Sequence, residues 1–331
     1  MIKLCPLLRQ PMRYAVIGTG AIGGFYGAKL QRSGVEVHFL LHKDYTHVQR
    51  HGLKIYSKDG DFCLPAVHAH ASPATIPVCD VVLIALKTTQ NNLLKDLLPP
   101  WVADQGILLT LQNGLGIEPQ LAQLVESDRV ILGGLCFICS HRGDPGTIHH
   151  QDYGSLTIGA YGDGYQPQGV TPLLETMARH WRQAGVETFL APDLGYARWK
   201  KLLWNVPFNG LSVVLSATTT EMMATPPTRA LARDLMEEVQ RAAASQGVAI
   251  PTADLEQMLH STATMAPYVT SMKRDYDRNL PLELEAILGY PLAVARGKGV
   301  ALPRMTMLHQ LLQHLDRQNR RHGSGTPAAP G

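Results

Sequence analysis

One segment of the chain sets a lysine and two asparagines at regular intervals among apolar residues. Lys201, Asn205 and Asn209 stand four residues apart in KLLWNVPFN, and this spacing places all three on one face of an α-helix. A buried polar stripe costs free energy unless it contacts another polar group. A solvated helix face is the alternative, although asparagine is a poor helix former and an odd choice there. We therefore predict that the stripe binds a polar ligand.

A glycine-rich turn near the N-terminus has the residues of a nucleotide site. Gly18-Thr19-Gly20-Ala21-Ile22-Gly23 is a complete G-x-G-x-x-G motif, preceded by the apolar run 14–17 and followed by a helical pattern over 25–32. The first glycine permits a tight turn, the second lets a pyrophosphate approach the backbone, and the third lets helix and strand pack closely. The helix N-terminus then presents N–H groups to the phosphates. A simple packing turn would not need all three glycines, so we predict a dinucleotide site.

The end of the next predicted strand, 36–41, indicates which dinucleotide binds. An NAD enzyme usually has an acidic residue here that holds the ribose 2′-hydroxyl. This chain has His42 and Lys43 instead, and its first acid is Asp44. Cations attract a 2′-phosphate and a carboxylate repels it. We therefore predict NADPH rather than NADH, with Lys43 as the main charge partner; the alternative is that both basic residues are ordinary solvated loop residues.

Two further apolar runs end in polar residues. The run 80–86 leads into Lys87, and the run 106–111 leads into Gln112 and Asn113. Such continuous runs are typical of parallel strands covered on both faces. Because ligands of doubly wound sheets bind beyond the carboxyl ends of the strands, we expect Lys87 and Asn113 to share one crevice with the glycine turn. A helix-capping lysine and a plain Asn-Gly turn are the alternatives.

The order of the predicted elements gives the fold class. Strand and helix patterns alternate through residues 12–192, which predicts an α/β Rossmann domain with a doubly wound, mostly parallel sheet. Only helical patterns follow, which predicts an all-helical domain over 193–319. Residues 1–11 are expected to be a loose extension ahead of Met12, and 320–331 a disordered tail. The later predicted elements are a hairpin over 53–64, strands at 130–139, 147–151, 155–159 and 186–190, and a helix over 173–184.

Length and composition narrow the classes of function. A chain of 331 residues favours two domains, and 45% hydrophobic with 17% charged residues fits a soluble globular protein. The net charge of +3 is not gathered into basic runs, so no nucleic-acid partner is expected. No apolar run is long enough to cross a bilayer, so no membrane partner is expected either. The oligomeric state stays open, and the sequence is compatible with a homodimer.

The cysteines and histidines predict no metal site. Cys136 and Cys139 have a C-x-x-C spacing, but residues three apart on a strand point to opposite faces, so core packing is the better interpretation. His149 and His150 alternate across a predicted strand in the same way. Reduced cysteines in a cofactor-dependent enzyme indicate a cytoplasmic protein.

In combination these motifs resemble the ketopantoate reductase (2-dehydropantoate 2-reductase) family, which belongs to the 6-phosphogluconate-dehydrogenase-like group of two-domain reductases. The likeness runs from Met12 to about Gln318. It rests on GTGAIG at 18–23, LKTTQ at 86–90, QNGLG at 112–116, PGTIHH at 145–150, KLLWNVPFN at 201–209, and S-x₁₁-E from Ser271 to Glu283.

The resemblance implies a role for each of these positions. Lys201 would be the general acid that protonates the substrate carbonyl as hydride arrives, and Glu283 the acid that holds the substrate hydroxyl and approaches the nicotinamide ribose. The implied substrate ligands are Lys201, Asn205, Asn209, Ser271 and Asn113. The implied cofactor contacts beyond the glycine turn and His42-Lys43 are Lys87, Asn113, Cys139 and Glu283.

The activity that follows is NADPH-dependent reduction of ketopantoate to pantoate. Hydride addition to a ketone builds negative charge on oxygen, which a positioned cation and proton donor stabilise. One asparagine of the family pattern, ten residues after Asn209, is Thr219 here, so another 2-oxo acid stays open as the substrate. An opine-type dehydrogenase on the same fold is a second alternative, and a non-catalytic NADP-binding sensor or scaffold is a third.

Overall fold

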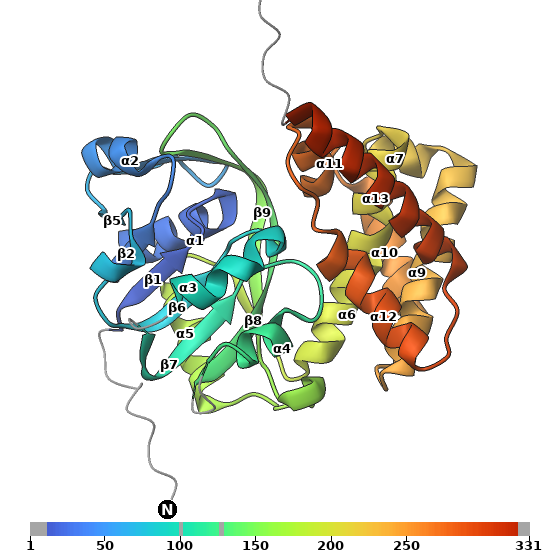
Figure 1. Ribbon diagram of the computed structural model, residues 1–331, viewed down its shortest axis with the longest axis horizontal. Helices are drawn as coiled ribbons and strands as arrows, with labels where there is room; N and C mark the ends of the chain where they lie inside the picture. Colours follow the sequence, from blue (N-terminus) through green and yellow to red (C-terminus); the bar gives the residue numbers. More distant parts are fainter. Residues whose placement is uncertain (1–11, 99–101, 126–128, 324–331) are drawn as a thin grey trace, which may run out of the picture. The chain divides into compact units, whose positions relative to one another are not determined.

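The computed structural model describes residues 12–98, 102–125 and 129–323 (Figure 1). The predicted loose extension over 1–11 therefore lies outside the described residues. The chain divides into two compact units. The first, here called the sheet unit, comprises the chain up to Gln112 together with Ile117–Leu194, and the second, the helical unit, comprises Asn113–Gly116 together with the chain from Gly195 onward.

The sheet unit is built on one ten-stranded sheet in the described part of the chain, in the order β4-β3-β9-β8-β7-β6-β1-β2-β5, with β10 paired to β9. Most neighbouring strands are parallel, whereas β8 pairs with β9 and β3 with β4 in antiparallel fashion. This confirms the predicted doubly wound, mostly parallel fold class. The strands are β1 (Tyr14–Ile17), β2 (Val37–Leu40), β3 (Leu53–Ser57), β4 (Phe62–Leu64), β5 (His68–His70), β6 (Cys79–Ile84), β7 (Val102–Thr110), β8 (Val130–Arg142), β9 (Thr147–Ala160) and β10 (Thr188–Ala191).

Helices cover both faces of this sheet. Successive strand residues point to opposite faces, so Tyr14 and Val16 of β1 join one buried cluster, whereas Ala15 and Ile17 join another. The first cluster includes residues of α1 (Ala21–Arg32), α2 (Tyr45–His51) and α5 (Pro172–Gln183), and the second includes residues of α3 (Leu94–Leu97) and α4 (Ile117–Ala122). Burial on both faces explains why the central strands read as continuous apolar runs.

One strand differs from its prediction. The segments 147–151 and 155–159 are parts of a single strand, β9, rather than two strands. Tyr153 and Gly154 have φ angles of 59° and 121° inside it, and the pairing with β8 shifts register there. The strand bends at this irregularity and then continues. In the sequence, the glycine at position 154 fits a turn between two strands equally well.

The helical unit holds helices α6 to α13 and two π-helical turns, as predicted for an all-helical region. They are α6 (Leu194–Trp204), η5 (Asn205–Asn209, π), α7 (Gly210–Leu215), α8 (Thr219–Ala224), α9 (Pro226–Ser245), α10 (Thr252–Thr264), α11 (Ser271–Asp277), η6 (Glu285–Gly289, π), α12 (Tyr290–Gly297) and α13 (Pro303–Gly323). Helix α13 continues to Gly323, so a disordered tail beginning at 320 is wrong by one helical turn. None of the described helices combines the length and apolarity needed to span a bilayer.

Candidate active site

The lysine–asparagine stripe crosses two kinds of helix. Lys201 lies near the end of α6, and Asn205 to Asn209 form the π-helical turn η5. The prediction of one uninterrupted α-helical face is therefore wrong. Pro207 accounts for the change, because it has no N–H to donate to the carbonyl of Leu203 and its ring would crowd that carbonyl in an α-helix. π-Helical turns of this kind are rare and often mark functional sites.

Both asparagines of the stripe are buried and incompletely bonded. Asn205 is 4% exposed and Asn209 is 1% exposed. Asn205 Nδ2 and Asn209 Oδ1 have no hydrogen-bond partner among the described residues. A buried polar group without a partner costs about 1–3 kcal/mol. A ligand hydroxyl would accept from Asn205 Nδ2 and donate to Asn209 Oδ1, whereas a carboxylate would supply only the acceptor for Asn205 Nδ2.

The two adjacent lysines have different surroundings. Lys200 Nζ donates to Asp254 Oδ1 at 2.8 Å, and the Tyr196 hydroxyl also donates to Asp254. Burial alone would raise the pKa of Asp254, but the hydrogen bonds from Lys200 and Tyr196 outweigh it and hold the pKa below its usual value. Lys200 is thus engaged in an ion pair with Asp254, and Lys201 is half-buried.

Glu283 lies beside the second π-helical turn. Its side chain is buried, and its carbonyl accepts a hydrogen bond from the Ile287 N–H at 3.3 Å. The helix begins one residue later, at Leu284, so Glu283 lies directly before it. The turns η5 and η6 contact each other. The fold thereby brings the turn that follows Glu283 against the turn that carries Asn205 and Asn209.

The short segment Asn113–Gly116 belongs to the same unit. The Leu115 N–H donates to the carbonyl of Ala286 at 2.8 Å. Gly114 has a φ of +106°, and a Cβ placed on it would lie 2.4 Å from the Ala286 oxygen. Only glycine fits such a close approach of two backbones. Half-buried Asn113 is therefore fixed next to η6, the turn that follows Glu283.

Ser271 is tied to the asparagine turn through residues that the sequence did not single out. Ser212 Oγ donates to the Asn209 carbonyl at 2.9 Å and lies 2.7 Å from Thr270 Oγ1. Thr270 is the N-cap of α11 and accepts from the Lys273 N–H, which places Ser271 at the first position of that helix. The only sequence signal for this link is the threonine before a helical pattern, a common capping residue.

Thr219, which stands where the family pattern has asparagine, has a structural partner. It is fully buried, its Oγ1 accepts from the Tyr268 N–H at 3.3 Å, and its own N–H donates to the Tyr268 carbonyl at 3.2 Å. The pair holds the segment that leads into Ser271.

The glycine turn in the sheet unit has the geometry that a pyrophosphate requires. Gly18 has a φ of +91°, and a Cβ there would lie 2.5 Å from the Leu86 nitrogen. A Cβ on Gly23 would lie 2.3 Å from the Gly18 oxygen, whereas one on Gly20 would meet nothing closer than 4.0 Å. The space above Gly20 and the start of α1 at Ala21 and Ile22 fit a dinucleotide phosphate.

Three other predicted cofactor residues, His42, Lys43 and Lys87, lie on the same unit, whereas Asn113 and Glu283 belong to the helical unit. Thr19 Oγ1 donates to the Leu40 carbonyl at 2.9 Å, which ties the glycine turn to the end of β2, just before exposed His42 and Lys43. Lys87 is exposed and directly follows Leu86, whose carbonyl accepts from the Gln112 side chain at 2.9 Å. This hydrogen bond thus joins the segments that follow the adjacent strands β6 and β7.

Cys139 lies buried on β8 opposite Asp152, and Cys136 is buried on the same strand. Neither is joined in a disulfide, and the described residues contain no cluster of three or more ligating side chains that could hold a metal ion.

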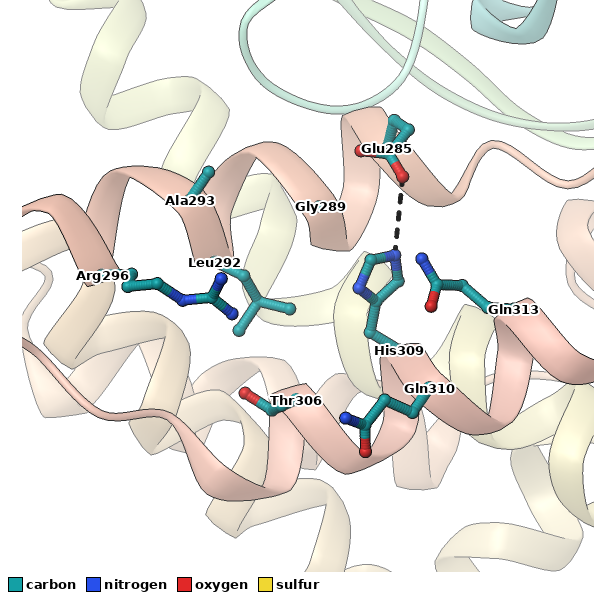
Figure 2. A pocket seen from close by; sticks show the side chains of 9 residues that line it. All are labelled: Glu285, Gly289, Leu292, Ala293, Arg296, Thr306, His309, Gln310 and Gln313. Atoms are coloured by element: carbon teal, nitrogen blue, oxygen red, sulfur yellow. Dashed lines mark ion pairs between the residues drawn. The ribbon is translucent and has the colours of Figure 1, made fainter.

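A pocket of about 340 Å³ on the helical unit contains none of the predicted site residues. Figure 2 shows that Glu285 of η6 points toward His309 of α13. Their carboxylate oxygen and imidazole nitrogen are 3.7 Å apart. Burial lowers the pKa of His309 despite the carboxylate. The residues that line the pocket are Glu285, Gly289, Leu292, Ala293, Arg296, Thr306, His309, Gln310 and Gln313.

Comparisons with known proteins agree with this geometry. A family model described as Ketopantoate reductase PanE/ApbA matches residues 14–163, and the model of its C-terminal part matches residues 193–316. A 2-dehydropantoate 2-reductase of Nostoc sp. is 51% identical over 308 residues, which cover 93% of this chain and 96% of the relative.

Solved structures give the same result. A 2-dehydropantoate 2-reductase from Geobacter metallireducens superposes with a TM-score of 0.87 at 42% identity, covering 92% of this chain and 99% of that one. The enzyme from Methylococcus capsulatus gives a TM-score of 0.83 at 33% identity, covering 96% of this chain and 99% of that one. With its glycine turn, its lysine–asparagine stripe and both family models in place, the chain belongs to the ketopantoate reductase family.

Proposed function

We propose that this chain reduces 2-dehydropantoate to pantoate with NADPH as the hydride donor. The observation that carries the proposal is the pair of buried asparagines, Asn205 and Asn209, whose Nδ2 and Oδ1 atoms have no partner among the described residues. They lie next to Lys201 in a chain that is 51% identical over 308 residues to a 2-dehydropantoate 2-reductase.

The residues of the helical unit have separate roles in protonating and orienting the substrate. The Lys201 ammonium protonates the carbonyl oxygen as negative charge develops on it. Asn205, Asn209 and Ser271 orient the 2-oxo acid through hydrogen bonds, and the Glu283 carboxylate accepts a hydrogen bond from the substrate hydroxyl. Buried amides with fixed positions bind the substrate without much loss of side-chain freedom on binding.

The residues of the sheet unit hold the cofactor, which supplies the hydride when bound. The turn Gly18–Gly23 receives the pyrophosphate at the start of α1, and Lys43 with His42 binds the 2′-phosphate. Lys87 of this unit, together with Asn113 of the helical unit, is assigned to the nicotinamide half. Cys139 is buried, so its contribution is limited to the shape of the strand that passes the site.

We further propose a cytoplasmic location, which is supported by four described cysteines that form no disulfide. A homodimer stays a prediction, and light scattering during size-exclusion chromatography would check it. No observation favours the opine-type or the sensor alternative. Thr219, the departure that left another 2-oxo acid open, is buried and bonded to the Tyr268 backbone.

The test is a substrate panel. NADPH oxidation is measured with ketopantoate, with pyruvate and with bulkier 2-oxo acids, and NADH is run in parallel. We expect the highest kcat/KM for ketopantoate with NADPH. A higher kcat/KM for another 2-oxo acid would contradict the substrate, and turnover only in the presence of an amine would favour the opine alternative.

A further inference from the structure

Asp44 is the acidic residue closest in sequence to the predicted 2′-phosphate site. It follows His42 and Lys43, and it is the N-cap of α2. The end of β2, to which this loop is attached, is joined to the glycine turn by the hydrogen bond from Thr19 to Leu40. A carboxylate at this place in a Rossmann sheet would serve the ribose hydroxyls of NAD and repel the extra phosphate of NADP.

The Asp44 carboxylate is engaged elsewhere. The guanidinium of Arg142, the last residue of β8, forms an ion pair with Asp44 Oδ2, and the Gly146 N–H donates to the same oxygen at 3.4 Å. The side chain of Asp44 is only 13% exposed, whereas that of Arg142 is 43% exposed. The carboxylate of this ion pair is therefore largely shielded from solvent, which favours a persistent contact.

The turn that supplies these donors is itself fixed. The Gly146 carbonyl accepts from the Lys54 N–H at 2.8 Å, so the turn is bonded to β3. A Cβ on Gly146 would lie 2.9 Å from the His47 ring of α2, so turn and helix are in close contact. Asp44 is thus held toward the β8–β9 turn by two donors on a rigid support.

The basic residues beside Asp44 remain available. His42 and Lys43 are exposed, and their side chains form no hydrogen bond or ion pair with another of the described residues. With Arg142 bound to Asp44, the acidic charge of the loop is neutralised and the charge of Lys43 is unopposed. Without Arg142, Asp44 would oppose Lys43 and would be able to turn toward the ribose.

We propose that Arg142 is a positioning residue for cofactor choice: it holds Asp44 away from the adenosine ribose and so leaves the 2′-phosphate to Lys43 and His42. The ligand class concerned is the 2′-phosphorylated adenosine of NADP. This inference rests on the proposed use of NADPH and adds a residue from a distant strand to it. The competing explanation is that the ion pair only fastens α2 to the β8–β9 turn.

A double-mutant cycle separates the two explanations. Dissociation constants for NADP⁺ and NAD⁺ are measured by calorimetry for the wild type, Arg142→Met, Asp44→Asn and the double variant, with Arg142→Lys as the conservative replacement. We expect Arg142→Met to reduce the preference for NADP⁺ about tenfold, the size of effect that one charge exerts across a partly solvated site. Arg142→Lys should keep most of the preference, and Asp44→Asn should keep all of it.

The decisive comparison is Arg142→Met in the Asp44→Asn background. If Arg142 acts by holding Asp44, its removal there should change the NADP⁺ to NAD⁺ ratio less than twofold. An equal loss in both backgrounds would show that Arg142 acts on the phosphate directly, and a lower melting temperature with an unchanged ratio would show a fastening role; either result overturns the inference. A wild type without any preference for NADP⁺ would instead overturn the proposed cofactor, before any variant is compared.

Discussion

Lys200 and Lys201 are neighbours in the chain, and Lys200 is held in an ion pair with Asp254. Replacing Lys201 by alanine should lower kcat by a factor on the order of 10² to 10⁴, the usual contribution of a general acid. Lys200→Ala is the matched control: it breaks the ion pair with Asp254, whose side chain is 15% exposed, so it should lower the melting temperature and leave kcat unchanged. Steady-state kinetics and thermal unfolding of both variants test this, and a larger kcat loss in Lys200→Ala would contradict it.

The buried asparagines make a second prediction at the residue scale. Asn205→Ala and Asn209→Ala should raise KM for the 2-oxo acid, because interactions with substrate and transition state are lost together. They should change the melting temperature little, since each removes an amide that is incompletely bonded in the ligand-free protein.

Asn319 provides the control for that experiment. It is also buried, but its Nδ2 donates to the Tyr276 carbonyl at 2.9 Å. Asn319→Ala should therefore lower the melting temperature and leave KM unchanged. The functional role of the stripe would be excluded if Asn205→Ala and Asn209→Ala behaved as Asn319→Ala does.

Residue types and spacing led to Lys201, Asn205 and Asn209, because a polar stripe in an apolar segment is visible in the sequence. They did not lead to Ser212 or Thr270, which connect the Asn209 turn to α11. Serine and threonine are common in every part of a chain, and only the fold brings these two together across 58 residues of sequence.

At the scale of elements, a glycine-to-alanine substitution at Gly114, which adds one methyl group, tests the contact between Asn113–Gly116 and η6. Gly114 and Gly60 have nearly the same φ, +106° and +107°, so alanine at either position carries similar backbone strain of about 1–3 kcal/mol. A Cβ on Gly60 meets nothing within 4 Å, whereas one on Gly114 meets the backbone of Ala286. Gly114→Ala should therefore lower kcat/KM by displacing Asn113 or η6, and Gly60→Ala should not. Equal kinetics for the two variants would show that the contact is not needed for activity.

A pair of histidines joins β2 to β5 and predicts a pH dependence. His38 Nδ1 lies 2.9 Å from His70 Nε2, and His38 Nε2 lies 2.9 Å from Glu36 Oε1. Burial lowers the pKa of His38 below its usual 6.5, and burial together with the neighbouring imidazoles lowers that of His70. The unfolded chain therefore takes up more protons than the folded protein below that pH.

The sign of the effect follows from linkage. Stability contributed by these two imidazoles is complete above pH 6.5 and is lost as the pH falls through their folded values. The melting temperature should thus fall between about pH 7.5 and pH 5.5, and His38→Gln should reduce that slope. Exposed His51 is the control, since His51→Gln should leave the slope unchanged. An unaltered slope in His38→Gln would contradict the role of the pair.

The elements themselves were predictable to different degrees. The strand β1 and the buried parts of β6 and β7 were clear from their apolar runs, because burial on both faces leaves few polar positions. The π-helical turn η5 was not predictable, because a spacing of four residues between the polar side chains fits an α-helix equally well. Only Pro207 signals that the hydrogen bonding of the helix must change there. The continuity of β9 was missed for a similar reason, since a left-handed Tyr153-Gly154 step occurs in turns and in bent strands alike.

At the scale of the whole molecule, two family models match two successive parts of the chain. The matches to residues 14–163 and 193–316 correspond to the α/β and helical regions. The assignment of Asn113–Gly116 to the helical unit was not predictable, because the segment follows a Rossmann strand directly and its partner Ala286 lies far along the chain. Local patterns indicate which element a residue belongs to, and only the folded chain shows which unit it packs with.

The assignment of Asn113–Gly116 to the helical unit matters for the design of chimeras between members of this family. A chimera joined at a single point near Leu194 would combine the QNGLG segment of one parent with the η6 turn of the other. Gly114 and Gly116 would then face Ala286 and Tyr290, or their replacements, from the other parent. A chimera that takes residues 113–116 and the chain from 195 onward from the same parent keeps those contacts intact. We expect the second design to retain more turnover than the first when both are built from this chain and a relative of moderate identity. The tetrapeptide would then count as part of the helical module when such enzymes are shuffled, although it is encoded within the nucleotide-binding half of the gene.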